Sequence, residues 1–220
     1  MGNKMRVLIS AALVVGAVSS PAMASTVTLD YLGQDPGARN VFFRIDSVSG
    51  GASAGQFKFD VVDRSQELLA WCVDITTRLR TDATEYTVDT DMFAPDVTGN
   101  LDKLFTQHYA AVTDATSSAA FQTAIWEIVY DTGNFDLYDG RFTLRSKTPD
   151  AVETMATSFL ALGNAVGGYS VSYLDAGVSA GGAAYSQNLV SVTLSAVPLP
   201  ASALLLVAGL GALGAARRRV

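Results

Sequence analysis

The residue with the clearest capacity for chemistry in this chain is Cys72, the only cysteine among 220 residues. A single cysteine cannot close an internal disulfide, so its presence calls for another explanation. Four explanations are open: a buried small hydrophobic residue, a partner in an intermolecular disulfide, a catalytic nucleophile, or one half of an unusual cross-link. Which of them holds depends on the residues that could act with this thiol.

His108, the only histidine, is the candidate base if Cys72 is the nucleophile of a hydrolase. It continues the apolar register of its expected helix, which favours a partly buried surface residue instead. One cysteine and one histidine cannot assemble a soft-ligand metal cluster, so we expect no metal and no other cofactor. The segment 131–140 offers oxygen ligands without the spacing of an EF-hand loop, and a solvated turn is the better interpretation.

Two short runs carry a likeness to a known family: Trp71-Cys72-Val73 and, fifty positions on, Phe121-Gln122-Thr123-Ala124-Ile125-Trp126. Together they resemble the thioester domains of bacterial surface adhesins, also called TQXA domains. That family pairs an aromatic-Cys-aliphatic strand with a helix that carries an apolar-Gln-x-Ala-aliphatic-Trp motif. The resemblance spans about Phe57 to Val192.

The resemblance implies an internal thioester between Cys72 and Gln122. A thiolate can attack a side-chain amide and expel ammonia if the two groups are held close, oriented and shielded from water. By analogy, Trp71 and Trp126 would shield the bond, and Asp74 would be the polar neighbour that adjusts its reactivity. The target would be an unknown surface or matrix molecule that attacks Gln122 with an amine or hydroxyl nucleophile.

Strands are expected before and around the cysteine. Phe57, Phe59 and Val61 alternate with polar residues, which is the period of a strand with one buried face. A second strand is expected over 68–75, with Cys72 on the face of Ala70 and Asp74. The glycine-rich segments 50–55 and 177–182 are expected to be loops, and 82–100 a polar loop.

Three helices are expected in the middle of the chain. The first covers 101–111. The second is capped by Ser117 or Ser118 and places Gln122 and Trp126 on one face, at the edge of an apolar stripe. That stripe consists of Phe121, Ala124, Ile125, Ile128 and Val129.

The third helix has Thr148 as its cap, Pro149 in its first turn and Gly163 after its end. Strands are expected again around 171–173 and 189–194. The fold class is therefore α+β: an antiparallel β-sandwich or barrel-like sheet with a segregated group of about three helices. Outside this domain we expect an N-terminal signal helix and a C-terminal transmembrane sorting helix.

The N-terminal segment has the three regions of a secretory signal peptide. Basic residues precede an apolar run, and Ala22-Met23-Ala24 supplies the small residues of a cleavage site, so Ala24 is the expected last residue removed and Ser25 the first retained. The domain boundaries expected from this are 1–24 for the signal, 25–196 for the globular domain and 197–220 for a sorting tail.

The C-terminal segment begins with the motif Val197-Pro198-Leu199-Pro200-Ala201 and ends with the basic cluster Arg217-Arg218-Arg219. Between them lies an apolar stretch that is short for a hydrocarbon core of about 30 Å. A basic cluster holds its end in the cytoplasm, and a plain single-pass anchor is the alternative. The arrangement resembles the PEP-CTERM class in its VPLPA variant, which implies processing by an exosortase and delivery to the surface of a Gram-negative cell.

Removal of both ends would make the chain more acidic. Five of the 15 basic residues lie in the ends, so the remaining charge is 10 − 21 = −11. Such a surface repels nucleic acid and anionic lipid, so we expect no nucleic-acid partner and membrane contact only through the sorting helix. The expected function is covalent adhesion by a self-modifying domain that is not an enzyme. A structural or biofilm matrix protein with a packed cysteine is the alternative, and a Cys-His hydrolase is less favoured.

Overall fold

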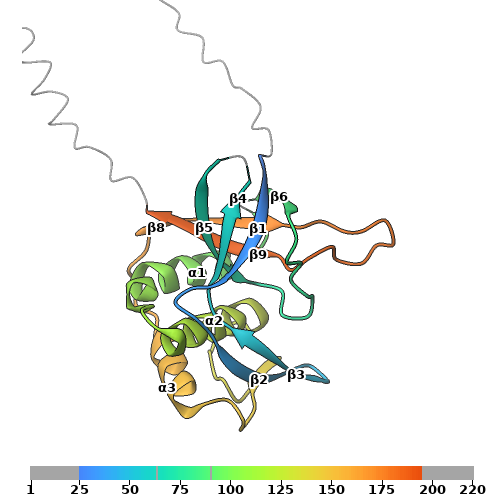
Figure 1. The fold of residues 1–220 in the computed structure, drawn as a ribbon. Coiled ribbons are helices and arrows are strands. Elements are labelled where there is room, and N and C mark those ends of the chain that lie inside the picture. Colours follow the sequence, from blue (N-terminus) through green and yellow to red (C-terminus); the bar gives the residue numbers. More distant parts are fainter. Residues whose placement is uncertain (1–24, 63, 90, 195–220) are drawn as a thin grey trace, which may run out of the picture.

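The computed structural model describes residues 25–62, 64–89 and 91–194, so both terminal segments expected from the sequence lie outside the described residues. The described part is a mixed α/β fold in which a closed antiparallel barrel, a three-stranded sheet and three α-helices pack together (Figure 1). Within the described residues no helix is long and apolar enough to cross a membrane.

Six strands close the barrel in the order β1-β4-β5-β9-β8-β6. Their bounds are β1 Thr26–Gln34, β4 Phe57–Val61, β5 Gln66–Cys72, β6 Thr84–Asp89, β8 Tyr169–Asp175 and β9 Leu189–Leu194. Closure leaves the barrel without a free edge strand. The expected strand over 57–61 is confirmed. The strand over 68–75 ends earlier than expected, at Cys72, and the expected polar loop over 82–100 contains β6.

The smaller sheet has the order β3-β2-β7, with β2 Arg39–Ile45, β3 Val48–Ala54 and β7 Phe142–Leu144. The expectation of a loop over 50–55 was therefore wrong, because Gly50 and Gly51 lie within β3. The rings of Phe43 and Phe42 lie against these glycines, since a Cβ atom would meet Phe43 at 2.8 Å and Phe42 at 3.1 Å. The neighbouring strand thus supplies the packing that the glycines lack.

Helix α2, Ala115–Tyr130, lies at the centre of the molecule. It contacts β5 of the barrel, all three strands of the smaller sheet, and the helices α1, Pro95–His108, and α3, Asp150–Phe159. Burial therefore extends around the whole helix from Ser117 to Ile128 and is not confined to one stripe. A short 3₁₀ turn, η1 Tyr109–Ala111, follows α1.

The helix starts differ from those expected. The carboxylate of Asp114 caps α2 by accepting hydrogen bonds from the backbone N–H groups of Thr116 and Ser117, so Ser117 and Ser118 lie inside the helix. Pro149 occupies the cap position of α3 without a side-chain hydrogen bond. The hydroxyl of Thr148 instead bonds the backbone of Phe42 on β2.

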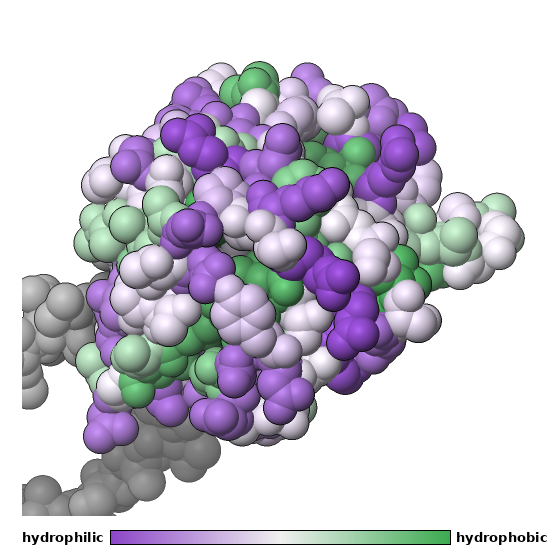
Figure 2. Space-filling view, turned by 90° about the horizontal axis from the view of Figure 1, so that it is seen from below, coloured by the Kyte–Doolittle hydropathy of each residue, from purple (hydrophilic) through white to green (hydrophobic). Residues whose placement is uncertain are grey.

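The surface mixes polar and apolar residues. Figure 2, a view from below, shows hydrophobic residues reaching the surface between polar ones. The large hydrophobic residues that are exposed are Leu32, Val48, Leu69, Tyr138, Val166, Val178 and Tyr185. Leu69 is exposed although its neighbours on β5, Ala70 and Trp71, are buried.

Candidate functional site

Cys72 is the last residue of β5 and pairs with Leu189 of β9. Its side chain is buried, with 1% of its surface exposed. The side-chain amide of Gln122 lies against its main chain: the Cys72 N–H donates to Oε1 of Gln122 at 3.0 Å, and Nε2 of Gln122 donates to the Cys72 carbonyl at 2.7 Å. The two residues that the sequence singled out are therefore neighbours, and both are shielded from solvent.

One face of α2 presents Gln122 to the end of β5. Gln122, Trp126 and Tyr130 are spaced four residues apart, so they follow one another along this face. Gln122 and Trp126 are 1% and 2% exposed. The hydroxyl of Tyr130 accepts a hydrogen bond of 3.2 Å from the backbone N–H of Ile75, just beyond β5. The helix is therefore joined to the chain on both sides of Asp74.

Trp71, next to Cys72 in the chain, and Trp126, one helical turn after Gln122, both pack against other aromatic rings. Trp126 contacts Phe43 of β2, with ring centroids 6.1 Å apart, and Phe142 of β7. Trp71 contacts Phe121 of α2 with centroids 4.8 Å apart. Both tryptophans expected to shield the bond are thus buried beside the motif, and each one connects a strand to the helical layer.

Burial raises the pKa of the Cys72 thiol to about 12. The indole of Trp126 and the backbone N–H of Asp74 oppose this effect, because both place a donor near the sulfur. The indole N–H of Trp126 is buried and makes no hydrogen bond of ordinary geometry. The thiol is therefore protonated near neutral pH, and the donors that would stabilise a thiolate are already close to it.

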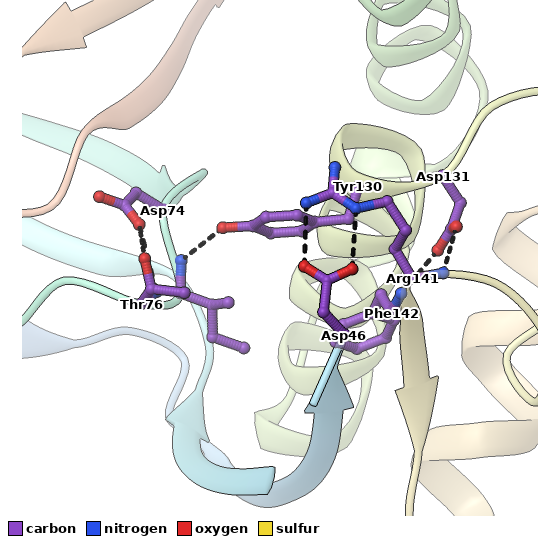
Figure 3. Close-up of polar contacts among 8 residues, drawn as sticks. Asp46, Asp74, Thr76, Tyr130, Asp131, Arg141 and Phe142 are labelled. Atoms are coloured by element: carbon purple, nitrogen blue, oxygen red, sulfur yellow. Dashed lines mark hydrogen bonds and ion pairs between the residues drawn. The ribbon is translucent and has the colours of Figure 1, made fainter. Parts of the chain in front are cut away.

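The carboxylate of Asp74 bonds residues of its own turn, as Figure 3 shows in part. It accepts hydrogen bonds from the backbone and hydroxyl of Thr76 and from the hydroxyl of Thr77. Its negative charge makes only the smallest contribution to the raised pKa of Cys72. Asp74 thus acts on the sulfur mainly through its backbone.

Tyr130 is not among the site residues predicted from the sequence. Its four-residue spacing from Trp126, and that of Trp126 from Gln122, is the pattern that could have identified it. Burial, and then the charge of Asp74, raise its pKa to about 12, so its hydroxyl is neutral at physiological pH. Arg141 lies over its ring at 5.9 Å and forms an ion pair with Asp46 at 3.2 Å (Figure 3). This cluster lies at the C-terminal end of α2, beside Tyr130.

His108 lies elsewhere: its ring packs on Phe159 of α3, with centroids 5.2 Å apart, and its Nε2 is buried without a partner. Among the described residues no cluster of three or more histidine, cysteine or acidic side chains could hold a metal ion. The signal cleavage residues Ala22 and Ala24, the sorting motif 197–201 and the arginines 217–219 lie outside the described residues. Ser25 precedes β1.

The chain was compared with protein-family models, curated proteins and solved structures, and none of them matches.

Proposed function

We propose that this chain is an exported surface protein whose domain forms a thioester between Cys72 and Gln122 and uses it to attach covalently to a target. The observation that supports this most is the pair of hydrogen bonds that holds the Gln122 amide against Cys72. Both groups are buried, and a strand end and a helix face hold them, which favours a fixed geometry and excludes water.

The bond would form by attack of the Cys72 sulfur on Cδ of Gln122. The C–S bond forms, the C–N bond breaks, and the thiol proton leaves with the amide nitrogen as ammonia. A target amine would then attack the same carbon: the new C–N bond forms an amide, the C–S bond breaks, and the Cys72 sulfur leaves and takes up a proton from the attacking amine. Because burial raises the pKa of Cys72 to about 12, we expect formation to be slow, which is compatible with a single modification per molecule.

Delivery to the surface is the second half of the proposal and rests on the sequence of the two ends. An exosortase-type enzyme would remove the tail by a cut near the motif at 197–201. The released domain would act in adhesion or in an extracellular matrix.

A structural role is the second candidate, and one observation favours it. The Gln122 amide satisfies both main-chain groups of Cys72 at the end of a buried strand, which stabilises the fold without any reaction. In that case Cys72 is a packed thiol and the protein binds its partners reversibly.

The intact mass of the purified mature protein distinguishes the two. A thioester predicts a mass lower than the sequence mass by one ammonia, and a methylamine adduct after treatment. Cys72→Ala is the best control, because it removes the thiol and keeps the main-chain groups that bind Gln122; it should show the full sequence mass. Full mass in the wild type, with Cys72 freely alkylated after unfolding, would refute the thioester and leave the structural role.

A further inference from the structure

Strand β3 has a free edge. Among the described strands it pairs only with β2, in a hairpin closed by the pair Ile45 and Val48. Main-chain groups of alternate residues face opposite edges of an antiparallel strand, so those of Ser49, Gly51 and Ser53 face away from β2. The Ser53 carbonyl accepts a hydrogen bond from the side chain of Gln34 at 2.9 Å. The outward groups of Ser49 and Gly51 bond no other described element, and both residues are exposed.

A groove follows this edge. It consists of two cavities of about 510 and 400 Å³ that share Gly51 and Ile75. Residues of β3 and of the segment 75–81 line it. In the second cavity the wall includes Gln187, whose buried Oε1 has no hydrogen-bond partner. The groove therefore offers unused main-chain groups along β3 and one unused acceptor at Gln187.

The groove borders the Cys72 and Gln122 pair. Phe43, which lines the first cavity, contacts Trp126. Ile75, which lines both cavities, donates its N–H to Tyr130. Gly50 lines the first cavity without a side chain, and the Phe43 ring packs over it, because a Cβ atom would lie 2.8 Å from that ring. A chain lying in the groove would therefore contact residues that themselves contact Trp126 and Tyr130 of α2.

We propose that an extended peptide segment of the target protein docks in this groove as an additional strand along β3. The free main-chain groups of Ser49 and Gly51 are those that a β-strand pairs with, and main-chain pairing needs no particular sequence. Residues 25–196 carry a net charge of 10 − 21 = −11, which favours a neutral or cationic segment. Small or apolar side chains suit the wall formed by Phe43, Ile45 and Ile75. The inference rests on the proposed function only for the later covalent step.

The docking step is tested on the Cys72→Ala protein, which cannot form a thioester. The probe is a pool of seven-residue peptides, the length of β3. Threonine and valine alternate along each peptide, and the central residue is arginine. We expect hydrogen exchange of the Ser49 and Gly51 amides, measured by NMR, to slow at least about tenfold when the pool is added. Unchanged exchange at both amides would overturn the proposal.

Ser49→Pro is the sharpest variant, because it removes an outward N–H and leaves the pairs with β2 intact. Ser49→Ala is the matched control and keeps that N–H. We expect Ser49→Ala to bind the pool as the parent does and Ser49→Pro to bind at least about tenfold more weakly. Equal binding by two folded variants would contradict docking along β3. If Ser49→Pro does not fold, the amide exchange of Ser49 and Gly51 in the Cys72→Ala protein tests docking without it.

A covalent arm separates this proposal from the proposed function. A peptide with lysine in place of the arginine should react with the wild type at least about tenfold faster than methylamine at equal concentration. Full mass with slowed amide exchange would refute the thioester and keep the docking site. A thioester that reacts equally with both amines, without slowed exchange, would keep the thioester and refute docking.

Discussion

At the scale of single residues, Glu127 has the least favourable surroundings for an ionisable group. It follows Trp126 on α2, is fully buried, and neither carboxylate oxygen has a hydrogen-bond partner. Burial, and then the charge of Asp131, raise its pKa from 4.5 to about 8. The folded protein therefore holds this proton at pH values where the unfolded chain has lost it.

This raised pKa predicts a pH-dependent stability. The contribution of Glu127 is fully present below about pH 4.5 and is lost as the pH rises toward 8, by up to about 1.4 kcal/mol for each pH unit. Glu127→Gln should remove this dependence and be more stable than the wild type near pH 8. Urea unfolding from pH 5 to 9 measures it. Glu85→Gln, at an exposed position of β6, is the control, and an equal pH profile for wild type and Glu127→Gln would contradict the prediction.

At the scale of elements, the start of α2 depends on Asp114. Its carboxylate accepts bonds of 2.8 Å from the N–H groups of Thr116 and Ser117. Asp114→Ala should lower the melting temperature of the protein, and Asp114→Asn, which still accepts these bonds, should lower it by clearly less. The Ser117 N–H lowers the pKa of Asp114 below 3.8, so this contribution is present at neutral pH and is lost only as the pH falls through that lowered value. Thermal unfolding at pH 7 measures the effect of the substitutions, and unfolding at pH 3 measures how much of the Asp114 contribution is lost in acid. Equal stability of Asp114→Ala and wild type at pH 7 would refute the cap.

The elements with a clear periodicity could be predicted from the sequence. Strand β4, the strands near the end of the described chain and the three helices follow from apolar spacing. The hairpin of β2 and β3 could not, because Gly50 and Gly51 carry no strand signal and are covered by Phe43 and Phe42 of the partner strand. The sequence predicts the cap of α2 at Ser117 or Ser118, a few residues after the actual cap, Asp114. Serine also favours the cap position, but here the Ser117 hydroxyl accepts a hydrogen bond from the backbone N–H of Asp114.

The two central residues of the candidate site could be predicted from the sequence, but the groove beside them could not. Cys72 and Gln122 could be named from their motifs, and the structure brings them together. The groove beside them depends on the free edge of β3 and on the path of the chain after β5, which are properties of the tertiary fold. Pairing of distant strands is set by packing between segments, so no local pattern could indicate it.

At the scale of the whole molecule, the candidate site and the described ends of the chain lie in different regions. The barrel begins with β1 and ends with β9, and β2 and β3 lie below it (Figure 1). The β2–β3 hairpin and the groove lie below the barrel, beside α2. Attachment through either end would therefore leave the groove accessible to a target.

Processing at both ends, as proposed, predicts a change in mass and charge. The protein recovered from the cell surface should begin at Ser25, end near Val197, and carry a net charge of about −11 in place of −6. Intact mass and isoelectric focusing measure this. Replacing both Ala22 and Ala24 by leucine should block the first cut, because the cleavage site requires small residues, and the retained segment would keep Lys4 and Arg6. Replacing Pro198 and Pro200 by alanine should block the second cut and keep the three arginines. A surface protein with the full sequence mass would contradict export with processing, whereas loss of only the N-terminal segment would favour a permanent single-pass anchor.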